Sequence, residues 1–270
     1  MLRIRLDTHD QYTVPRINYP DWVLSRYAWR GDERVLDVGS GPGVYYEALC
    51  ERCPQADYMG LDLSFGILAQ HPVPNRLVTA DVLHLPFTNQ HFDVVMANHM
   101  LFHVSDVEDA IVEIQRVLHP DGVLMAATNS AQTMPEFYTL FRRALMLLSA
   151  HGKLHSQPPP MPHSSFTLEG GVRKLSRHFY AVVRHDISSA FVFDTVEPVM
   201  NYIESWRDLR EPQLPDDVHW DDVMDVMREQ IARVIAHMGE LVVNKVSGVL
   251  IASNRGGFIH DFVEARHKTV

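Results

Sequence analysis

One acid and three alternating glycines form the pattern in this sequence with the clearest chemical meaning: Asp37, Gly39, Gly41 and Gly43. They lie at the end of residues 35–38, a short run with two β-branched valines that predicts a buried parallel strand. Glycine has no Cβ, so the chain can turn sharply and a ligand can lie against the main chain. A helix expected over 44–52 would point its N-terminus at that ligand. The pattern predicts a cofactor-binding loop; a strand-to-helix turn without a ligand is the alternative.

The spacing of these glycines separates two classes of nucleotide-binding protein. A dinucleotide fingerprint, G-x-G-x-x-G, needs glycine at position 44, where this chain has Val44. The order Asp37-x-Gly39-x-Gly41-x-Gly43 instead resembles the first motif of the class I S-adenosylmethionine (SAM) methyltransferases. That resemblance implies that the loop, Ser40 included, holds the methionyl part of SAM, whose ammonium and sulfonium groups are cationic. An acid beside the loop then makes electrostatic sense.

Two further acids follow the next two expected strands. Asp62, with Leu63 after it, ends a strand expected over 58–63 and lies 21 residues beyond Gly41. An ionised carboxylate there can accept both hydroxyls of a ribose, in SAM and NAD enzymes alike. Asp81 and Val82 follow a strand expected over 76–80. The resemblance implies that Asp81 takes the adenine amino group and that the Val82 backbone contacts the ring.

Two histidines follow the fourth expected strand, over 93–97, where open α/β sheets place their ligands. His99 and His103 are candidate bases, because histidine titrates near neutral pH; a structural role is the alternative for each. Relatives of the resembled family carry a histidine where Phe102 stands. Asn98 and His99 are also expected to contact SAM. A metal pair is disfavoured, because Met100 occupies the glutamate position of the zinc protease motif.

Other residues have weaker patterns. Tyr12 and Tyr19 lie in an N-terminal segment that resembles the cofactor-covering lid of small-molecule methyltransferases, with Tyr12 expected at SAM; surface packing is the alternative. Tyr202, Trp206 and Trp220 line an aromatic pocket or form helix core. Cys50 and Cys53 form a lone C-x-x-C without a second ligand pair, which predicts reduced thiols and no metal.

The composition limits the classes of partner. The chain has 270 residues and a formal net charge of −10, from 34 acidic and 24 basic side chains. An acidic surface repels phosphate backbones, and residues 98–101 lack the Asn-Pro-Pro-Tyr run of nucleobase methyltransferases, so no nucleic acid partner is expected. No apolar run reaches the ~20 residues of a membrane span and the start lacks a signal-peptide core, so we expect a cytoplasmic protein with no membrane partner. The sequence leaves the oligomeric state open.

Alternating strands and helices predict the fold. After the strands named above we expect a helix over 107–118, a turn at 119–122 and a strand over 123–127. Further helices are expected over 20–29, 134–150, 196–206 and 220–238, a stiff connection over 151–165, and late strands over 179–187, 190–193 and 246–252. The resemblance implies a Rossmann-like, seven-stranded, mostly parallel sheet with helices on both faces. We expect an N-terminal lid over 1–30, a SAM-binding core over 31–133, and remaining strands with a substrate-covering insertion (about 195–238) over 134–270.

The sequence therefore predicts a SAM-dependent methyltransferase that acts on a small organic molecule and produces S-adenosylhomocysteine. The resemblance is to quinone-biosynthetic and natural-product enzymes, which implies a role in the biosynthesis of a specialised metabolite or a cofactor. An NAD-dependent oxidoreductase and a non-catalytic SAM-binding protein stay open. The methyl acceptor, and whether oxygen, nitrogen or carbon receives the methyl group, are undetermined.

Overall fold

The computed structural model describes residues 1–149 and 164–255. These residues fall into two compact units. The sheet unit comprises Asn18–Ala131, His163–Asp186 and Ser247–Val270, and the helical unit comprises Met1–Ile17, Gln132–Pro162 and Ile187–Val246, as far as their residues are described. Two long strands contribute residues to both units.

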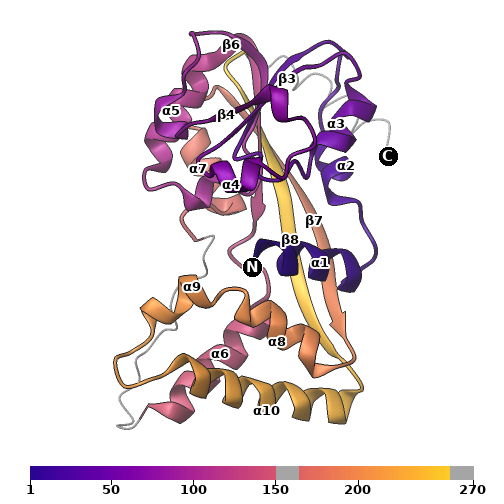
Figure 1. The fold of residues 1–270 in the computed structure, drawn as a ribbon, viewed down its shortest axis with the longest axis vertical. Helices are drawn as coiled ribbons and strands as arrows, with labels where there is room; N and C mark the ends of the chain where they lie inside the picture. Colours follow the sequence, from indigo (N-terminus) through magenta and orange to yellow (C-terminus); the bar gives the residue numbers. More distant parts are fainter. Residues whose placement is uncertain (150–163, 256–270) are drawn as a thin grey trace. The chain divides into compact units, whose positions relative to one another are not determined.

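The described strands form an eight-stranded sheet in the order β1-β7-β8-β6-β5-β2-β3-β4 (Figure 1). Their bounds are β1 Thr13–Val14, β2 Arg34–Val38, β3 Asp57–Asp62, β4 Leu77–Thr79, β5 Phe92–Met96, β6 Leu118–Asn129, β7 Ala181–Phe193 and β8 Leu241–Ser253. The pairs β2–β3, β2–β5, β3–β4 and β5–β6 are parallel, whereas β6–β8 and β1–β7 are antiparallel. The carboxyl ends of β4, β3, β2 and β5 therefore lie along one edge.

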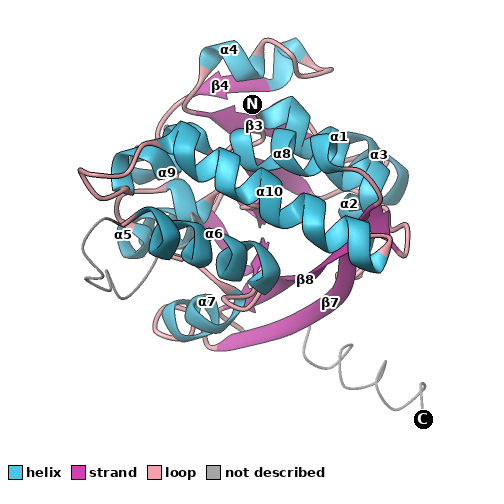
Figure 2. Ribbon diagram, turned by 90° about the horizontal axis from the view of Figure 1, so that it is seen from below, coloured by secondary structure: helices cyan, strands magenta, loops and turns pink. Residues whose placement is uncertain are grey.

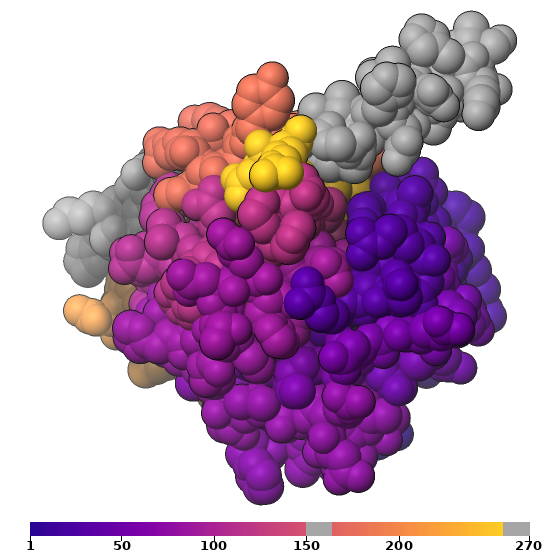
Figure 3. Space-filling view, turned by 90° about the horizontal axis from the view of Figure 1, so that it is seen from above, coloured from indigo at the N-terminus to yellow at the C-terminus, as the bar shows by residue number. Residues whose placement is uncertain are grey.

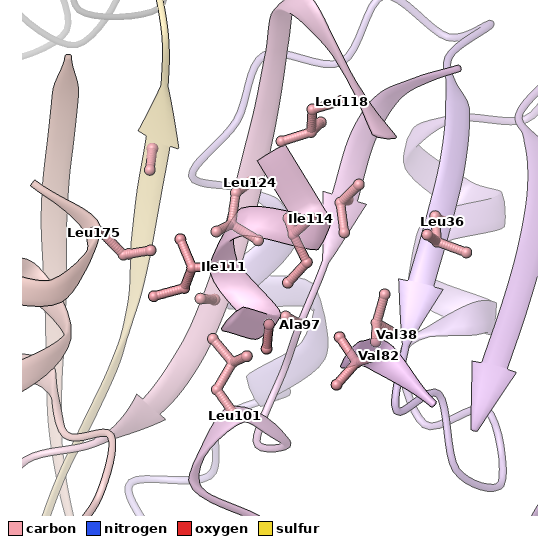
Figure 4. Close-up of a cluster of buried hydrophobic side chains, with 14 of the residues drawn as sticks. Leu36, Val38, Val82, Ala97, Leu101, Ile111, Ile114, Leu118, Leu124 and Leu175 are labelled. Carbon is pink, nitrogen blue, oxygen red and sulfur yellow. The ribbon is translucent and has the colours of Figure 1, made fainter. Parts of the chain in front are cut away.

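Helices cover both faces of the parallel strands. Those of the sheet unit are α2 Tyr19–Leu24, α3 Tyr46–Arg52, α4 Phe65–Leu68, α5 Val107–Val117 and α7 Leu168–Leu175, with 3₁₀ turns η1 Pro74–Arg76, η2 Val82–His84 and η3 Leu101–His103. Asp106 caps α5, since its Oδ1 accepts hydrogen bonds from two backbone N–H groups of the first turn. Ile111 and Ile114 on the apolar face of α5 lie beside Leu124 and belong to the same buried cluster as Leu36 (Figure 4).

The opposite face of the same strands carries a second core. Side chains alternate between the faces of a strand, so Val35, Val94 and Met96 point away from α5. They pack with Leu24 of α2 and Leu49 of α3, all almost fully buried. The segments from α2 to β6, indigo to magenta, make up much of the face in Figure 3.

The helical unit has its own apolar core. Its helices are α1 Leu2–Tyr12, α6 Pro135–Leu148, α8 Val196–Glu204, α9 Arg207–Arg210 and α10 Trp220–Met238, with the 3₁₀ turn η4 Glu211–Gln213. In Figure 2, α10 lies between α6 and α8. Trp220, Phe141 and Phe191 are buried at the centre of this core.

The predicted Rossmann-like α/β fold is confirmed, with some corrections. The sheet of the described residues has eight strands instead of seven, because the two residues of β1 pair with β7. The two strands expected over 179–187 and 190–193 are the single strand β7, and α1 and α7 were not predicted. The expected turn at 119–122 is instead a bulge within β6, since Leu118 pairs with Phe92 and Val123 with Val94. The connection expected over 151–165 lies almost entirely outside the described residues.

None of the helices in the described ranges is long and apolar enough to cross a membrane. The predicted domain boundaries stay a prediction.

Candidate active site

The glycine loop after β2 has a backbone that only glycine adopts readily. The φ angles of Gly39, Gly41 and Gly43 are 67°, 56° and 84°, all in the left-handed region. A Cβ on Gly39 would lie 2.6 Å from the Cβ of Met100, so the first loop position is also closely packed. The turn continues to Tyr45, and α3 begins at Tyr46, two residues later than predicted, because Tyr46 N donates to Gly43 O at 3.0 Å. The residues that follow β2 directly are therefore those of the glycine loop, and α3 begins only after it.

Asp62, at the end of β3, holds two backbone segments with one carboxylate. Its Oδ2 accepts from Gly41 N at 3.0 Å, and its Oδ1 accepts from Ser64 N at 2.9 Å. A carboxylate offers about four lone-pair sites, so two remain for further donors. Asp62 is half-buried, which leaves its oxygens reachable. The structure thus ties the predicted ribose acid directly to the glycine loop.

Asp37, the acid before the loop, is 2% exposed. Burial raises its pKa to about 7, helped by the nearby negative charge of Asp62, while a hydrogen bond from Tyr58 acts in the opposite direction. That bond runs from Tyr58 Oη to Asp37 Oδ2 at 3.3 Å. Among the described residues no ion pair involves Asp37, so a cationic ligand group would be its natural counter-charge.

Asp81, Val82 and Leu63 lie at the ends of β4 and β3. The Oδ1 of Asp81 accepts from Leu83 N at 3.0 Å and caps η2. Val82 is buried beside Val38 (Figure 4), whereas Leu63 is 72% exposed. The neighbouring Phe65 is 74% exposed, so two large apolar side chains follow Asp62 in contact with solvent.

Asn98, after β5, has one satisfied and one unsatisfied polar atom. Its Oδ1 accepts from Ala127 N at 3.0 Å, which fixes the orientation of the amide. Its Nδ2 is buried without a hydrogen-bond partner in the described structure. A buried donor without a partner is costly, so Asn98 is suited to a ligand oxygen.

The two candidate bases differ in their surroundings. His99 has a left-handed backbone with φ of 55°, and its N–H donates to Ala127 O at 2.8 Å. Its ring lies 5.4 Å from that of Tyr19, centroid to centroid. His103 lies in η3, is exposed, and its ring lies 4.4 Å from that of Phe102. Uncommon backbone in a non-glycine residue often marks a functional position, which favours His99.

The other predicted residues are distributed over both units. Tyr19 belongs to the sheet unit, where its Oη donates to Gly248 O at 3.0 Å. Tyr12 belongs to the helical unit, where its ring packs 4.8 Å from that of Phe193. Tyr202 and Trp220 are buried in the core of the helical unit, and Trp206 packs against it.

The two cysteines are free thiols. Cys50 is exposed, and the buried Cys53 donates from Sγ to Glu33 Oε2 at 2.9 Å. In the part of the chain that the structure describes, no group of three or more potential ligand side chains could hold a metal ion.

Three residues of this site were missed by the sequence interpretation. Tyr58 and His71 form a hydrogen-bonded chain to Asp37, and Met100 closes over Gly39. Gly60 of β3 pairs with Asp37, and Tyr58 lies two residues before Gly60. Residues two apart on a strand share a face, so this spacing could have indicated that Tyr58 lies on the same face as Asp37. His71 follows α4 in an irregular segment and has no pattern that predicts its position.

Comparison with known proteins finds a family match over the residues that form this candidate site. Residues 36–126 match the family model described as a methyltransferase domain (Methyltransf_11), which confirms the resemblance seen in the motifs. All four strand ends described above fall within that segment.

Curated relatives match over part of their length. The chain is 34% identical over 117 residues to a malonyl-[acyl-carrier protein] O-methyltransferase of Legionella pneumophila, covering 41% of each protein. It is 34% identical over 131 residues to a demethylmenaquinone methyltransferase of Corynebacterium urealyticum, covering 47% of this chain and 55% of that protein. The chain thus spans about half or less of these relatives.

Solved structures share the fold over most of the chain. Protein BH2331 of Bacillus halodurans has a TM-score of 0.57 at 18% identity, and the match covers 86% of this chain and 97% of the BH2331 chain. The [4+2]-cyclase SpnF has a TM-score of 0.52 at 16% identity and covers 87% and 80%. These similarities show the fold alone, because proteins with this fold differ in reaction.

Proposed function

We propose that this chain is a class I SAM-dependent methyltransferase that methylates a small organic molecule. One observation carries the proposal: four adjacent parallel strands, β4, β3, β2 and β5, end in Asp81, Asp62, the glycine loop and Asn98 along one edge of the sheet. Ligands of open α/β sheets bind at the carboxyl ends of the strands. The match of residues 36–126 to a methyltransferase domain supports the same assignment.

The residues present fit SAM. The buried Nδ2 of Asn98 has no hydrogen-bond partner in residues 1–149 and 164–255 and suits an oxygen of the cofactor. Asp37 has no basic partner among the described side chains and suits the cationic methionyl end. In the proposed arrangement the loop from Gly39 to Gly43 holds the methionyl group, Asp62 binds the ribose, and Asp81 with Val82 binds the adenine.

The protein's contribution to the reaction is positioning and water exclusion. SAM, when bound, supplies a methyl group on a sulfonium that is a good leaving group. The chain has to hold an acceptor in line and, for an acceptor that carries a proton, remove it. We assign the removal of this proton to the imidazole of His99, which would act as the general base. His99 has a left-handed backbone and follows β5, whereas His103 is exposed.

The acceptor is proposed to be a small organic molecule used in biosynthesis. Two relatives are named for malonyl-[acyl-carrier protein] and demethylmenaquinone, which are chemically unlike each other. Both names denote organic acceptors, and neither denotes a nucleic acid. The net charge of −10 disfavours a nucleic acid substrate.

The proposal is tested with SAM carrying a radiolabelled methyl group. The purified chain is incubated with a malonyl thioester, a demethylnaphthoquinol and a panel of phenols, amines and carboxylic acids, and transferred label is measured after extraction. Transfer to at least one acceptor, lost in His99→Gln but retained in His103→Gln, supports both the reaction and the base. Binding of SAM without transfer to any acceptor would favour a non-catalytic SAM-binding protein.

A further inference from the structure

Beneath the glycine loop lies a chain of three buried polar side chains that the proposed reaction does not use directly. Tyr58 Oη lies 3.3 Å from Asp37 Oδ2 and 2.9 Å from His71 Nε2. The three residues are 2%, 5% and 5% exposed, in the order Asp37, Tyr58, His71. Buried polar groups of this kind are stabilised only when each has a partner.

The direction of each hydrogen bond follows from one backbone donor. Val73 N donates to His71 Nδ1 at 3.3 Å, so Nδ1 is the acceptor nitrogen of a neutral imidazole. The proton of that ring is then on Nε2, which donates to Tyr58 Oη. The phenol in turn donates its own proton to Asp37 Oδ2. Burial lowers the pKa of His71 and raises that of Tyr58, so both side chains stay neutral near pH 7.

The same histidine supports the glycine loop. A Cβ on Gly43 would lie 2.8 Å from both Nε2 and Cδ2 of the His71 ring. The Tyr46 ring contacts the Tyr58 and His71 rings at centroid distances of 5.0 and 5.6 Å. The loop and the acid before it are therefore held by one packed group.

The groups facing Asp37 determine how easily it ionises. Asp62 contributes a negative charge from the end of β3, and Tyr45 contributes a buried hydroxyl that has no hydrogen-bond partner among the described residues. Tyr58 is the group that stabilises the ionised carboxylate, because it donates a hydrogen bond to it. His71 acts on Asp37 only through Tyr58.

We propose that Tyr58 and His71 are positioning residues that hold Asp37 as a carboxylate for the cationic methionyl end of SAM, so that cofactor affinity depends on pH through Asp37. This inference rests on the function proposed above. It assigns a role to two residues outside the glycine motif, one on β3 and one after α4. It also explains why an acid is tolerated in a buried position: the phenol supplies one hydrogen bond, and the cofactor supplies the charge.

The test compares Tyr58→Phe with Tyr46→Phe. Both substitutions remove one phenol oxygen from the same ring cluster, but the Tyr46 hydroxyl lies outside the chain to Asp37. The dissociation constants for SAM and S-adenosylhomocysteine are measured by calorimetry from pH 6 to pH 9 and divided by those of the unsubstituted protein. This ratio cancels the titration of the ligands.

Loss of the Tyr58 hydroxyl should raise the pKa of Asp37 by about one unit. Tyr58→Phe should then weaken binding about tenfold at pH 6 and very little at pH 9, where Asp37 is ionised in both proteins. Tyr46→Phe should stay within about twofold throughout. His71→Gln should shift the pH profile of the relative dissociation constant in the same direction but by less. The Tyr58 phenol becomes a poorer hydrogen-bond donor to Asp37 when it no longer accepts a hydrogen bond itself.

If Tyr58→Phe loses the same factor of affinity for SAM at every pH, the role of Tyr58 is purely structural and the inference is overturned. The His71→Gln profile keeps the test decisive if Tyr58→Phe does not fold: a profile that matches the unsubstituted protein would also overturn it. An unsubstituted protein that binds neither compound would overturn the proposed function itself.

Discussion

At the scale of single residues, Asp62 combines an observed structural role in the loop with the ribose contact proposed for it. Its carboxylate holds Gly41 N and Ser64 N while leaving acceptor sites for a ribose. Removing the side chain would therefore remove the proposed ribose contact and two loop contacts together. A substitution that keeps the shape separates these effects better than truncation.

We predict that Asp62→Asn weakens SAM binding by about tenfold and Asp62→Ala by more, because hydrogen bonds to a charged acceptor contribute about 1.5–3 kcal/mol. The asparagine retains one oxygen for the loop. Calorimetric titration gives the affinities, and circular dichroism confirms folding. Unchanged affinity in Asp62→Ala would remove Asp62 from the cofactor site.

The buried Asp37 predicts a dependence of stability on pH. Its pKa is about 7 in the folded chain against an ordinary value of 3.8. Between these values the folded state holds a proton that the unfolded state has released, so this group's contribution to stability falls as pH rises from about 4 to 7. An asparagine at position 37 cannot ionise. The free energy of unfolding of Asp37→Asn, taken relative to that of the original chain, should therefore rise by at least about 1 kcal/mol from pH 5 to pH 8.

Urea unfolding without ligand at pH 5 and pH 8 measures this difference. The same variant should bind SAM more weakly at pH 8. A free-energy difference between the two proteins that is constant with pH would mean that Asp37 is ionised normally in the fold.

At the scale of elements, the strands and the amphipathic helices were predictable from the sequence. The five strands from β2 to β6 were located by apolar runs, and α5 by its one-sided apolar face. α1 was missed because its apolar residues at 2, 4 and 6 alternate and its only buried residue is Thr8. α7 was missed because it contains Gly170 and Gly171, which are poor helix formers.

The site was partly predictable for the same reason. Acids and glycines at strand ends follow local patterns, so the places of Asp37, Asp62 and Asp81 at or near the ends of β2, β3 and β4 could be predicted from the sequence. Contacts between segments distant in the chain have no local signature. His71 contacts Tyr58 across 13 residues of sequence, and Met100 after β5 lies close to Gly39 after the neighbouring strand β2; neither contact could be predicted from spacing.

The loop geometry gives a prediction at this scale. Gly39→Ala places a Cβ 2.6 Å from Met100 Cβ at a φ of 67°, and should destabilise the chain by about 1–3 kcal/mol and abolish SAM binding. Gly66→Ala in α4 is the matched control, since its Cβ would have no heavy atom within 4 Å and its φ is unremarkable. Thermal unfolding and calorimetry report both effects; similar behaviour of the two variants would contradict the geometry.

At the scale of the whole molecule, the sheet unit contains the segment, residues 36–126, that matches the methyltransferase domain model, and the helical unit carries a separate core. The predicted cofactor residues from Asp37 to Asn98 all lie in the sheet unit, whereas Tyr12 lies in the helical unit. The sheet unit alone therefore supplies the glycine loop, the acids at the ends of β3 and β4, and Asn98, whose Nδ2 has no hydrogen-bond partner among the described residues. The fold is shared with proteins of other activities, so cofactor class is the central question.

Calorimetric titration of the purified chain with SAM, S-adenosylhomocysteine and NAD, in separate runs, tests that question most directly. We predict saturable binding of the first two compounds and none of NAD, because Val44 breaks the dinucleotide pattern and Asp81 follows β4. Binding of NAD alone would contradict the account and assign the chain to hydride transfer.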